Sequence, residues 1–237
     1  MGISNLIFAL CVGLAAFLFG KNVIKIKRNI MLGRDIDRSD RSSERWKTMA
    51  RVALGQSKML VRPVAGFLHI LVYVGFVIIN IEVLEIVIDG LLGTHRVFAF
   101  MGGFYDFLIG SFEILALLVL VSCVIFLIRR NLVQIKRFVM KEMDGWPKTD
   151  ANLILIFEIL LMSAFLFMQG ADLTLQKLGA AHYIQAGSYP VSSFLVLVFD
   201  GMSIETVLAF ERGFWWFHIL GILAFLNYLP YSKHFHI

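Results

Sequence analysis

Cysteine and charge are both scarce in this sequence. Of its 237 residues only Cys11 and Cys123 are cysteines, and they stand far apart, with no CxxC pair. An iron-sulfur cluster needs several thiolates at close spacing, so this chain does not itself hold one. The GxGxxG, P-loop, HExxH and nucleophile-elbow motifs are also absent from the sequence, which excludes the soluble chemistries that those motifs serve.

Charged residues make up 16% of the chain and hydrophobic residues 59%, with a mean hydropathy of +0.79. Such a chain is too apolar to cover a soluble globule with polar surface. Five apolar runs are long enough to cross the ~30 Å hydrocarbon core as helices. We therefore predict an all-α integral membrane protein, a single domain over residues 1–237 that forms a five-transmembrane-helix bundle, with spans at about 3–20, 64–88, 104–128, 152–168 and 213–233.

Two apolar stretches need separate interpretation. The run from Val191 to Phe199 is too short to span a membrane and is typical of an interfacial or loop element. The first run lacks the preceding basic region and the following small-residue cleavage pattern of a signal peptide, since Lys21 and Asn22 come next. It is therefore interpreted as a true membrane helix.

Basic residues gather in two of the four connections between spans. Lys21 to Arg62 holds twelve Lys and Arg, and Arg129 to Lys148 holds six, whereas the other two connections hold only Arg96, Lys177 and Arg212. The positive-inside rule then places both basic connections in the cytoplasm, with the N-terminus outside and the C-terminus cytoplasmic. Topology thus explains the net charge of +5 and leaves no case for nucleic acid; these connections face lipid headgroups or dock a cytoplasmic partner.

Histidines within apolar segments are the candidate functional residues, because an ionisable side chain inside a membrane is costly. His69 lies seven residues past Arg62, about 10 Å along the second span. Gly66 and Gly75 flank it and open space for a flat ligand or for a closely packed helix. Taken alone, His69 is also compatible with a simple interhelical hydrogen bond.

The last span adds three more histidines. His218 and His236 are eighteen residues apart, about five whole turns, so both imidazoles face the same side of a continuous helix. His234 points to nearly the opposite side, unless Pro230 kinks the helix and changes that phase. Two imidazoles on one face of a bundle helix suit axial ligation of haem.

Depth decides the expected pairing of these ligands. His218 lies six residues past Arg212, which we take as the outer edge, whereas His69 and His236 both lie close to the inner edge. Pairing His69 with His218 would leave them misaligned by roughly 10 Å. We therefore expect His69 and His236 to be the first metal ligands, followed by His218, with His234 as the alternative to His236.

These segments resemble a known family. "RPVAGFLHILVYVGF" and "FWWFHILGILAFLNYLPYSKHFHI" are similar to the membrane cytochrome b subunit of respiratory nitrate reductase, its gamma subunit. They are still more similar to the N-terminal membrane half of heterodisulfide-reductase-like iron-sulfur oxidoreductases. In both families five helices carry b-type haem through histidines of the second and fifth helices, and the resemblance assigns His69, His218 and His236 to those positions.

Two departures from that pattern matter. Nitrate reductase carries a second histidine about ten residues after the first on the second helix, where this chain has Ile79 and then Asn80. His218 therefore lacks its expected partner, which leaves one haem b or two; the loop residues His95 and His182 are possible substitutes. No cysteine-rich domain follows in this sequence, so we expect the clusters in a following cytoplasmic iron-sulfur domain or in a separate subunit.

The resemblance implies a membrane b-type cytochrome, the electron-transfer part of a quinone-linked oxidoreductase, in a bacterial or archaeal cell membrane. It would pass electrons between menaquinone or ubiquinone and a cytoplasmic iron-sulfur protein, with Arg62 and Lys233 beside the haem propionates. The quinone, the direction of electron flow, the terminal acceptor and the oligomeric state stay open. The alternative is a non-redox transporter or assembly scaffold. It is supported by the acidic residues within the spans, namely Glu82, Glu85, Glu113 and Glu158.

Overall fold

The computed structural model describes residues 2–37, 39–57 and 59–236, and of residues 60, 137, 235 and 236 it describes the backbone alone. All regular structure in these ranges is helical. Within the described residues five helices are long and apolar enough to cross a membrane, in agreement with the predicted all-α bundle. They are α1 (Ile3–Ile30), α3 (Pro63–Leu92), α4 (Gly103–Asn131), α5 (Trp146–Lys177) and α6 (Ile204–Tyr228).

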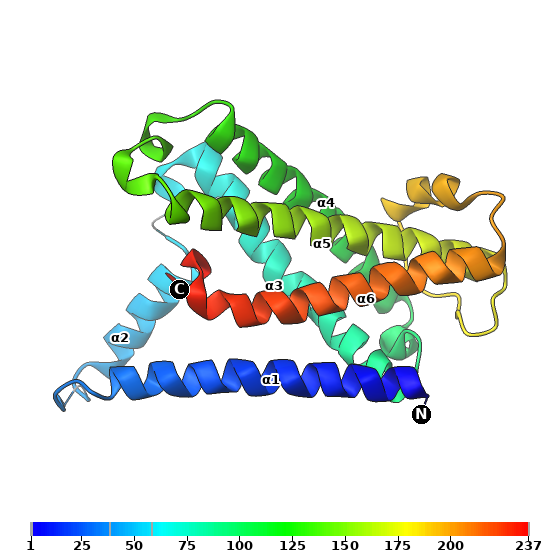
Figure 1. Ribbon diagram of the computed structural model, residues 1–237, viewed down its shortest axis with the longest axis horizontal. Coiled ribbons are helices and arrows are strands. Elements are labelled where there is room, and N and C mark those ends of the chain that lie inside the picture. The colour runs from blue at the N-terminus through cyan, green and yellow to red at the C-terminus, as the bar shows by residue number, and fades with distance from the viewer. Residues whose placement is uncertain (1, 38, 58, 237) are drawn as a thin grey trace.

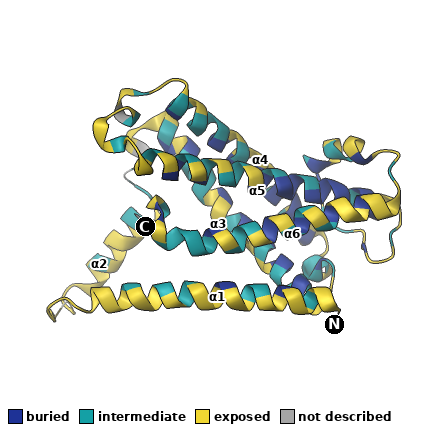
Figure 2. Ribbon diagram, viewed as in Figure 1, coloured by how far each residue is buried: buried dark blue, intermediate teal, exposed yellow. Residues whose placement is uncertain are grey.

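The helix α5 is the centre of the bundle and α1 its edge. In Figure 1, α4 and α6 lie on either side of α5, and α3 crosses the bundle obliquely to reach the start of α1. Half of the most apolar window of α5 is buried, against 11% of that of α1. Figure 2 accordingly shows α1 largely exposed and the second half of α5 buried. Lipid is the natural solvent for the apolar outer faces.

Short helices cap the two ends of the bundle. The basic end, which we define by the connections between α1 and α3 and between α4 and α5, carries α2 (Ser42–Met49), a π-helical turn (Ala50–Leu54) and three 3-10 turns (Met59–Val61, Lys136–Phe138 and Lys141–Met143). The opposite end carries the 3-10 helices Val97–Met101 and Ser192–Phe199. This last helix corresponds to the short apolar run that was predicted not to span.

The helix α6 differs from its prediction at both ends. It begins at Ile204, because the Ser203 side chain accepts a hydrogen bond from Thr206 N at 3.3 Å and so caps the first turn. It ends at Tyr228 and gives way to the 3-10 turns Leu229–Tyr231 and Lys233–His236, as expected where Pro230 cannot continue an α-helix. The helix is thus interrupted at Pro230, the alternative named above, and the same-face argument for His218 and His236, which required a continuous helix, does not hold.

Close helix contacts are made at glycines. A Cβ atom at Gly75 of α3 would lie 2.5 Å from Cγ2 of Val119 on α4, and one at Gly221 of α6 would lie 2.6 Å from Cδ2 of Leu161 on α5. Of the two roles expected for Gly75, the structure thus shows the closely packed helix. Such contacts draw α3, α4, α5 and α6 around the cavity described next.

Candidate functional site

Three of the predicted histidines line one cavity inside the bundle. The histidine cavity, as we name it, has a volume of about 290 Å³ and lies among α3, α4, α5, α6 and the C-terminal turns. His69 enters it from α3, His218 from α6 and His234 from the last 3-10 turn. The other lining side chains are mostly apolar, and Glu158 of α5 contributes a carboxyl group. A largely apolar pocket with a few polar groups is typical of a cofactor site.

His218 has the environment of a metal-ligating imidazole. It is 1% exposed, and its Nδ1 lies 3.0 Å from the carbonyl oxygen of Leu161. A carbonyl only accepts hydrogen bonds, so Nδ1 carries the proton and Nε2 presents a lone pair. Within the described part of the chain Nε2 has no hydrogen-bond partner. A backbone carbonyl that fixes the tautomer from the far side of the ring is the usual arrangement around a ligating histidine.

His218 lies deeper in the bundle than its sequence position indicated. The expected depth was counted from Arg212 as the outer edge, but α6 starts at Ile204, so His218 is the fifteenth of its 25 residues. Arg212 lies inside the helix because its guanidinium pairs with the neighbouring Glu211, with Nη2 2.5 Å from Oε1. His218 thus lies near the middle of α6 and not near its outer end, while its depth relative to the membrane surface stays a prediction.

The imidazoles occupy at least two levels along the cavity. The ring of His234 packs against that of Phe225, with centroids 5.4 Å apart. Because Phe225 lies seven residues beyond His218, His234 sits roughly 10 Å closer to the basic end. His69 is the seventh residue of α3, which starts at Pro63 at that same end. The cavity can thus offer nitrogen ligands from facing helices and at different depths.

Two other predicted site residues, Arg62 and Lys233, are not among the lining residues of the histidine cavity. Arg62 is the exposed residue that precedes α3, and its carbonyl accepts the Gly66 amide at 2.6 Å. Lys233 donates its backbone N–H to Asp150 Oδ2 at 2.9 Å, which ties the C-terminal turn to the start of α5. The side chain of His236 lies outside the described part of the structure, so its predicted role as a ligand stays a prediction.

The residues of the histidine cavity fit a haem. A buried imidazole nitrogen without a partner, a carbonyl that orients the same ring and an apolar lining with further imidazoles are what an axially ligated porphyrin requires. Among the described side chains no three His, Cys, Asp or Glu residues gather as a site for a single metal ion. This does not conflict with haem, because the porphyrin itself supplies four of the iron ligands.

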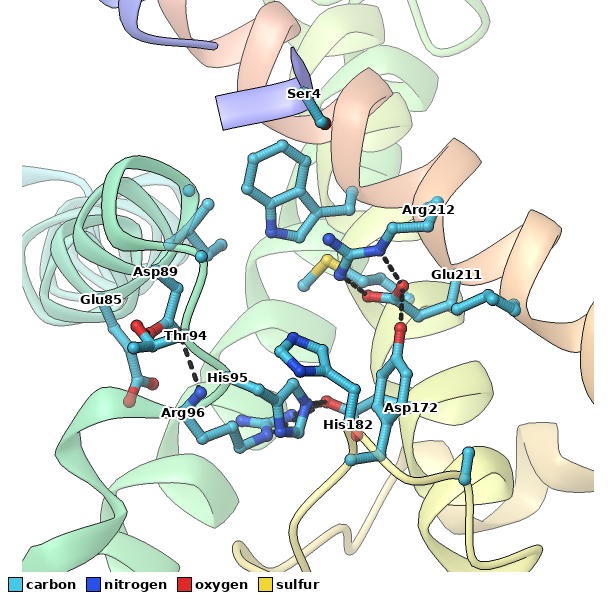
Figure 3. A pocket seen from close by; sticks show the side chains of 18 of the residues that line it. Ser4, Glu85, Asp89, Thr94, His95, Arg96, Asp172, His182, Glu211 and Arg212 are labelled. Carbon is cyan, nitrogen blue, oxygen red and sulfur yellow. Dashed lines mark hydrogen bonds and ion pairs between the residues drawn. The ribbon is translucent and has the colours of Figure 1, made fainter. Parts of the chain in front are cut away.

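A second cavity opens at the opposite end of the bundle (Figure 3). This acidic cavity has a volume of about 630 Å³ and lies among the start of α1, the end of α3, α5, α6 and the loops that follow α3 and α5. Five carboxylic acids and two arginines line it, together with two histidines; these are Glu82, Glu85, Asp89, Asp172, Glu211, Arg96, Arg212, His95 and His182.

Arg96 is the centre of a buried polar network beside this cavity. Its guanidinium donates to Asp172 Oδ2 from Nη2 at 2.6 Å, to the Tyr105 hydroxyl at 3.1 Å and to Gln169. Burial alone would lower the pKa of Arg96, but the surrounding acids, Asp172 foremost, reverse the effect and raise it. The side chain is therefore a fixed cation although it is only 6% exposed.

The two loop histidines belong to the acidic cavity. His95 Nε2 lies 3.2 Å from Asp172 Oδ2, and its Nδ1 accepts the Ile184 amide at 3.3 Å, so both ring nitrogens are engaged. His182 packs edge-on against Tyr183 in the loop after α5. Both line the acidic cavity and neither lines the histidine cavity, so they do not supply the missing partner of His218.

The polar half of α5 was not predicted from the sequence. Gln169, Asp172 and Gln176 all lie beyond the predicted end of the fourth span at residue 168, yet α5 continues to Lys177. Gln169 and Asp172 reach Arg96, and Gln176 Nε2 donates to Asp172 Oδ1 at 2.8 Å. Their spacing of three and four residues is that of one helix face, and this was the signal that could have revealed them.

The chain is similar to two curated oxidoreductases. It is 27% identical over 235 residues to the probable iron-sulfur-binding oxidoreductase FadF of Bacillus subtilis. The aligned region covers 98% of this chain and 31% of the relative. It is 25% identical over 232 residues to the EtfAB:quinone oxidoreductase of Syntrophomonas wolfei. That aligned region covers 94% of this chain and 30% of the relative. No family model and no solved structure matches.

The two similarities run along nearly the whole chain, but the chain spans only about a third of the length of these relatives. They support a relationship to iron-sulfur oxidoreductases.

Proposed function

We propose that this chain is a membrane b-type cytochrome that passes electrons between the quinone pool and an iron-sulfur oxidoreductase module. The observation that carries the proposal is the buried His218 imidazole, whose Nε2 has no partner among the described residues and which lines a cavity with His69 and His234. The names of the two relatives supply the partners, one being called iron-sulfur-binding and the other quinone oxidoreductase.

His218 and His69 are the proposed first ligands. The Leu161 carbonyl holds the His218 ring so that Nε2 faces away from it, and His69 approaches from the facing helix α3. With one haem, both imidazoles bind the same iron. With two, His69 pairs with His234 or His236 near the basic end, and His218 serves a separate site.

Bound haem b would supply a one-electron iron centre inside a region that excludes water. The apolar lining of the cavity, Phe76 and Ile222 for example, would keep solvent from the iron. Arg62 and Lys233 at the basic end are the proposed partners of the propionates. The iron-sulfur clusters themselves belong to a partner subunit or to a further domain, because this sequence has only 2 cysteines.

We place the basic end in the cytoplasm, on the asymmetry of basic residues between the connections. The C-terminal turns, which lie at that end (Figure 1), would then face a cytoplasmic iron-sulfur module. The setting is a bacterial or archaeal cell membrane, and menaquinone or ubiquinone is the proposed lipid-soluble partner.

The reduced-minus-oxidised absorption spectrum of the purified protein tests the proposal, with haem quantified per polypeptide. We expect a b-type spectrum that His218→Ala and His69→Ala each abolish if there is one haem, or halve if there are two. His182→Ala is the matched control, since His182 lines only the acidic cavity, and it should keep the full spectrum.

His234→Ala and His236→Ala identify the C-terminal ligand, because only the variant that removes a ligand should lose haem. Full haem retention in the variants of His69, His218, His234 and His236 would remove the basis of the assignment. A folded but colourless wild-type protein would instead favour the transporter or scaffold alternative.

A further inference from the structure

The acidic cavity carries an inference about the quinone, and this inference rests on the proposed function. Its volume of about 630 Å³ lies within the usual range of ligand sites. Five acids against two arginines line it, so it disfavours an anionic ligand such as a carboxylate or phosphate. An uncharged ring that exchanges protons suits such a lining.

The cavity has an apolar side that is partly exposed. Ile204 and Leu208 of α6 line it and are 40% and 38% exposed, and Phe8 lines it from α1. Because α1 is the least buried of the five long helices, the side of the cavity that α1 and α6 line is where a ligand with a hydrocarbon tail can enter from the membrane. The loop side, with Thr94 and His182 exposed, opens toward water.

In four of the five acids both carboxylate oxygens accept structural hydrogen bonds. Glu85 accepts from Phe98 N and from the Tyr105 hydroxyl, both at 2.8 Å. The other three are equally committed: Asp89 accepts from Thr94, Arg96 N and Val97 N, Asp172 from Arg96, His95 and Gln176, and Glu211 from Tyr183 and Arg212. A proton added to any of these carboxylates would break part of the network.

Glu82 differs from the others. It is 3% exposed, and its Oε1 accepts from Gln169 Nε2, with Arg96 Nη1 at 4.0 Å. Its Oε2 has no hydrogen-bond partner among the described residues. An uncommitted oxygen on a buried carboxyl that lines a cavity is the one group here that can take up or release a proton without disturbing the fold.

The two cavities meet across about one helical turn. On α3, Val83 lines the histidine cavity and Glu82 the acidic cavity. On α6, His218 lines the first, and Trp215, three residues away, lines the second. Three residues of helix measure ~4.5 Å, so a ring at the inner wall of the acidic cavity lies close to the proposed haem site.

We propose that the acidic cavity binds the quinone ring and that Glu82 exchanges its protons. Oxidation of one quinol to quinone breaks two O–H bonds and releases two electrons and two protons. Glu82 Oε2 takes up the two protons in turn and releases each to water at the loop side, and a bound haem would accept the two electrons one at a time. Reduction of a quinone runs through the same groups in reverse, with the iron-sulfur module as the electron donor.

Binding is tested with menadione, a naphthoquinone, titrated calorimetrically into the full chain in lipid nanodiscs. Leu208 lines the cavity, so Leu208→Trp fills part of the space for the ring and should weaken menadione binding by about tenfold or more. Leu117→Trp is the matched control, because Leu117 on α4 is 39% exposed and lines neither cavity. Equal affinities in the two variants would overturn the assignment of the binding site. This measurement does not require haem, so its result is separate from the spectrum that tests the proposed function.

Proton exchange is tested by stopped-flow reduction of haem with menadiol. Glu82→Gln should slow the reaction by about 100-fold or more, the usual contribution of a positioned acid or base, while calorimetric affinity for menadione changes little. Glu113→Gln is the matched control, since Glu113 is equally buried and lines neither cavity. Glu82→Asp, which keeps a carboxyl group, should recover part of the rate. Haem content shows that each variant is folded, and a Glu82→Gln rate close to that of Glu113→Gln would overturn the role of Glu82 while leaving the cytochrome assignment intact.

Discussion

Arg96 extends into the bundle from a loop and donates to several buried groups the hydrogen bonds that water would otherwise supply. Its backbone lies in the left-handed region at φ 57°, and its amide donates to Asp89 Oδ2 at 2.7 Å, which turns the chain back toward the interior. The guanidinium then meets the acceptors of α4 and α5 in different directions. Its planar set of five donors suits this task, and a lysine ammonium does not reproduce it.

Replacing Arg96 should therefore destabilise the protein strongly. Arg96→Met leaves the Asp172 carboxylate without its buried cation and the Gln169 side-chain oxygen without its donor, and breaking a buried pair from one side costs about 3–5 kcal/mol. Arg96→Lys should fall between Arg96→Met and wild type. Thermal unfolding in detergent, followed by circular dichroism, measures the effect. Arg34→Met, at an exposed position of the basic end, should change Tm by little, and equal Tm values for the two Met variants would contradict the network.

At the scale of the element, hydropathy located the helices but not their ends. The core of each span is apolar, so composition sufficed to find it. The end of α5 is polar, and its Gln169 and Asp172 become acceptable inside only because Arg96 arrives from another segment. The start of α6 was missed for a similar reason, since Arg212 and Glu211 neutralise each other within the helix. Tertiary partners of this kind leave no local pattern in a sequence.

The candidate site was predictable to a similar extent. A histidine in an apolar run is conspicuous, so His69, His218 and His234 could be selected from the amino-acid sequence alone. Their mutual placement could not, because Pro230 ends α6 early and folds the C-terminal turns back, as the Phe225 and His234 rings show by packing edge-on. The acidic cavity was invisible in the sequence, because its lining comes from helices and loops that are distant along the chain.

Helix packing predicts that replacing glycine by alanine changes the stability of the protein in opposite directions at two positions. Gly75→Ala places a Cβ 2.5 Å from Cγ2 of Val119, a stiff β-branched side chain, and should force α3 from α4 at a cost of about 1–3 kcal/mol. Gly213→Ala on α6 meets nothing within 4 Å and should stabilise its helix by up to ~1 kcal/mol. Thermal unfolding compares them, and a Gly75→Ala protein as stable as Gly213→Ala would show that the α3–α4 contact is looser than described.

At the scale of the whole molecule, the two ends of the bundle have different chemistry. The basic end holds most of the Lys and Arg residues and the C-terminal turns, and the opposite end holds the acidic cavity. The histidine cavity lies between them, one helical turn from the acidic cavity. If the basic end is cytoplasmic, protons exchanged at Glu82 come from or go to the outside, whereas electrons enter or leave on the inside. Orientation thus decides whether electron transfer moves charge across the membrane.

Labelling of engineered cysteines in intact cells measures that orientation. Ser39→Cys lies in the exposed basic connection and Gln185→Cys in the exposed loop after α5 at the opposite end. Since basic connections are retained in the cytoplasm, a membrane-impermeant maleimide should label Gln185→Cys in intact cells and Ser39→Cys only after the membrane is permeabilised. Cys11 is replaced by serine and Cys123 by alanine beforehand, so that neither native thiol reacts with the maleimide. The reverse labelling pattern would mean that the bundle has the opposite orientation in the membrane. The acidic cavity would then lie on the cytoplasmic side, and the iron-sulfur module would have to contact the chain there.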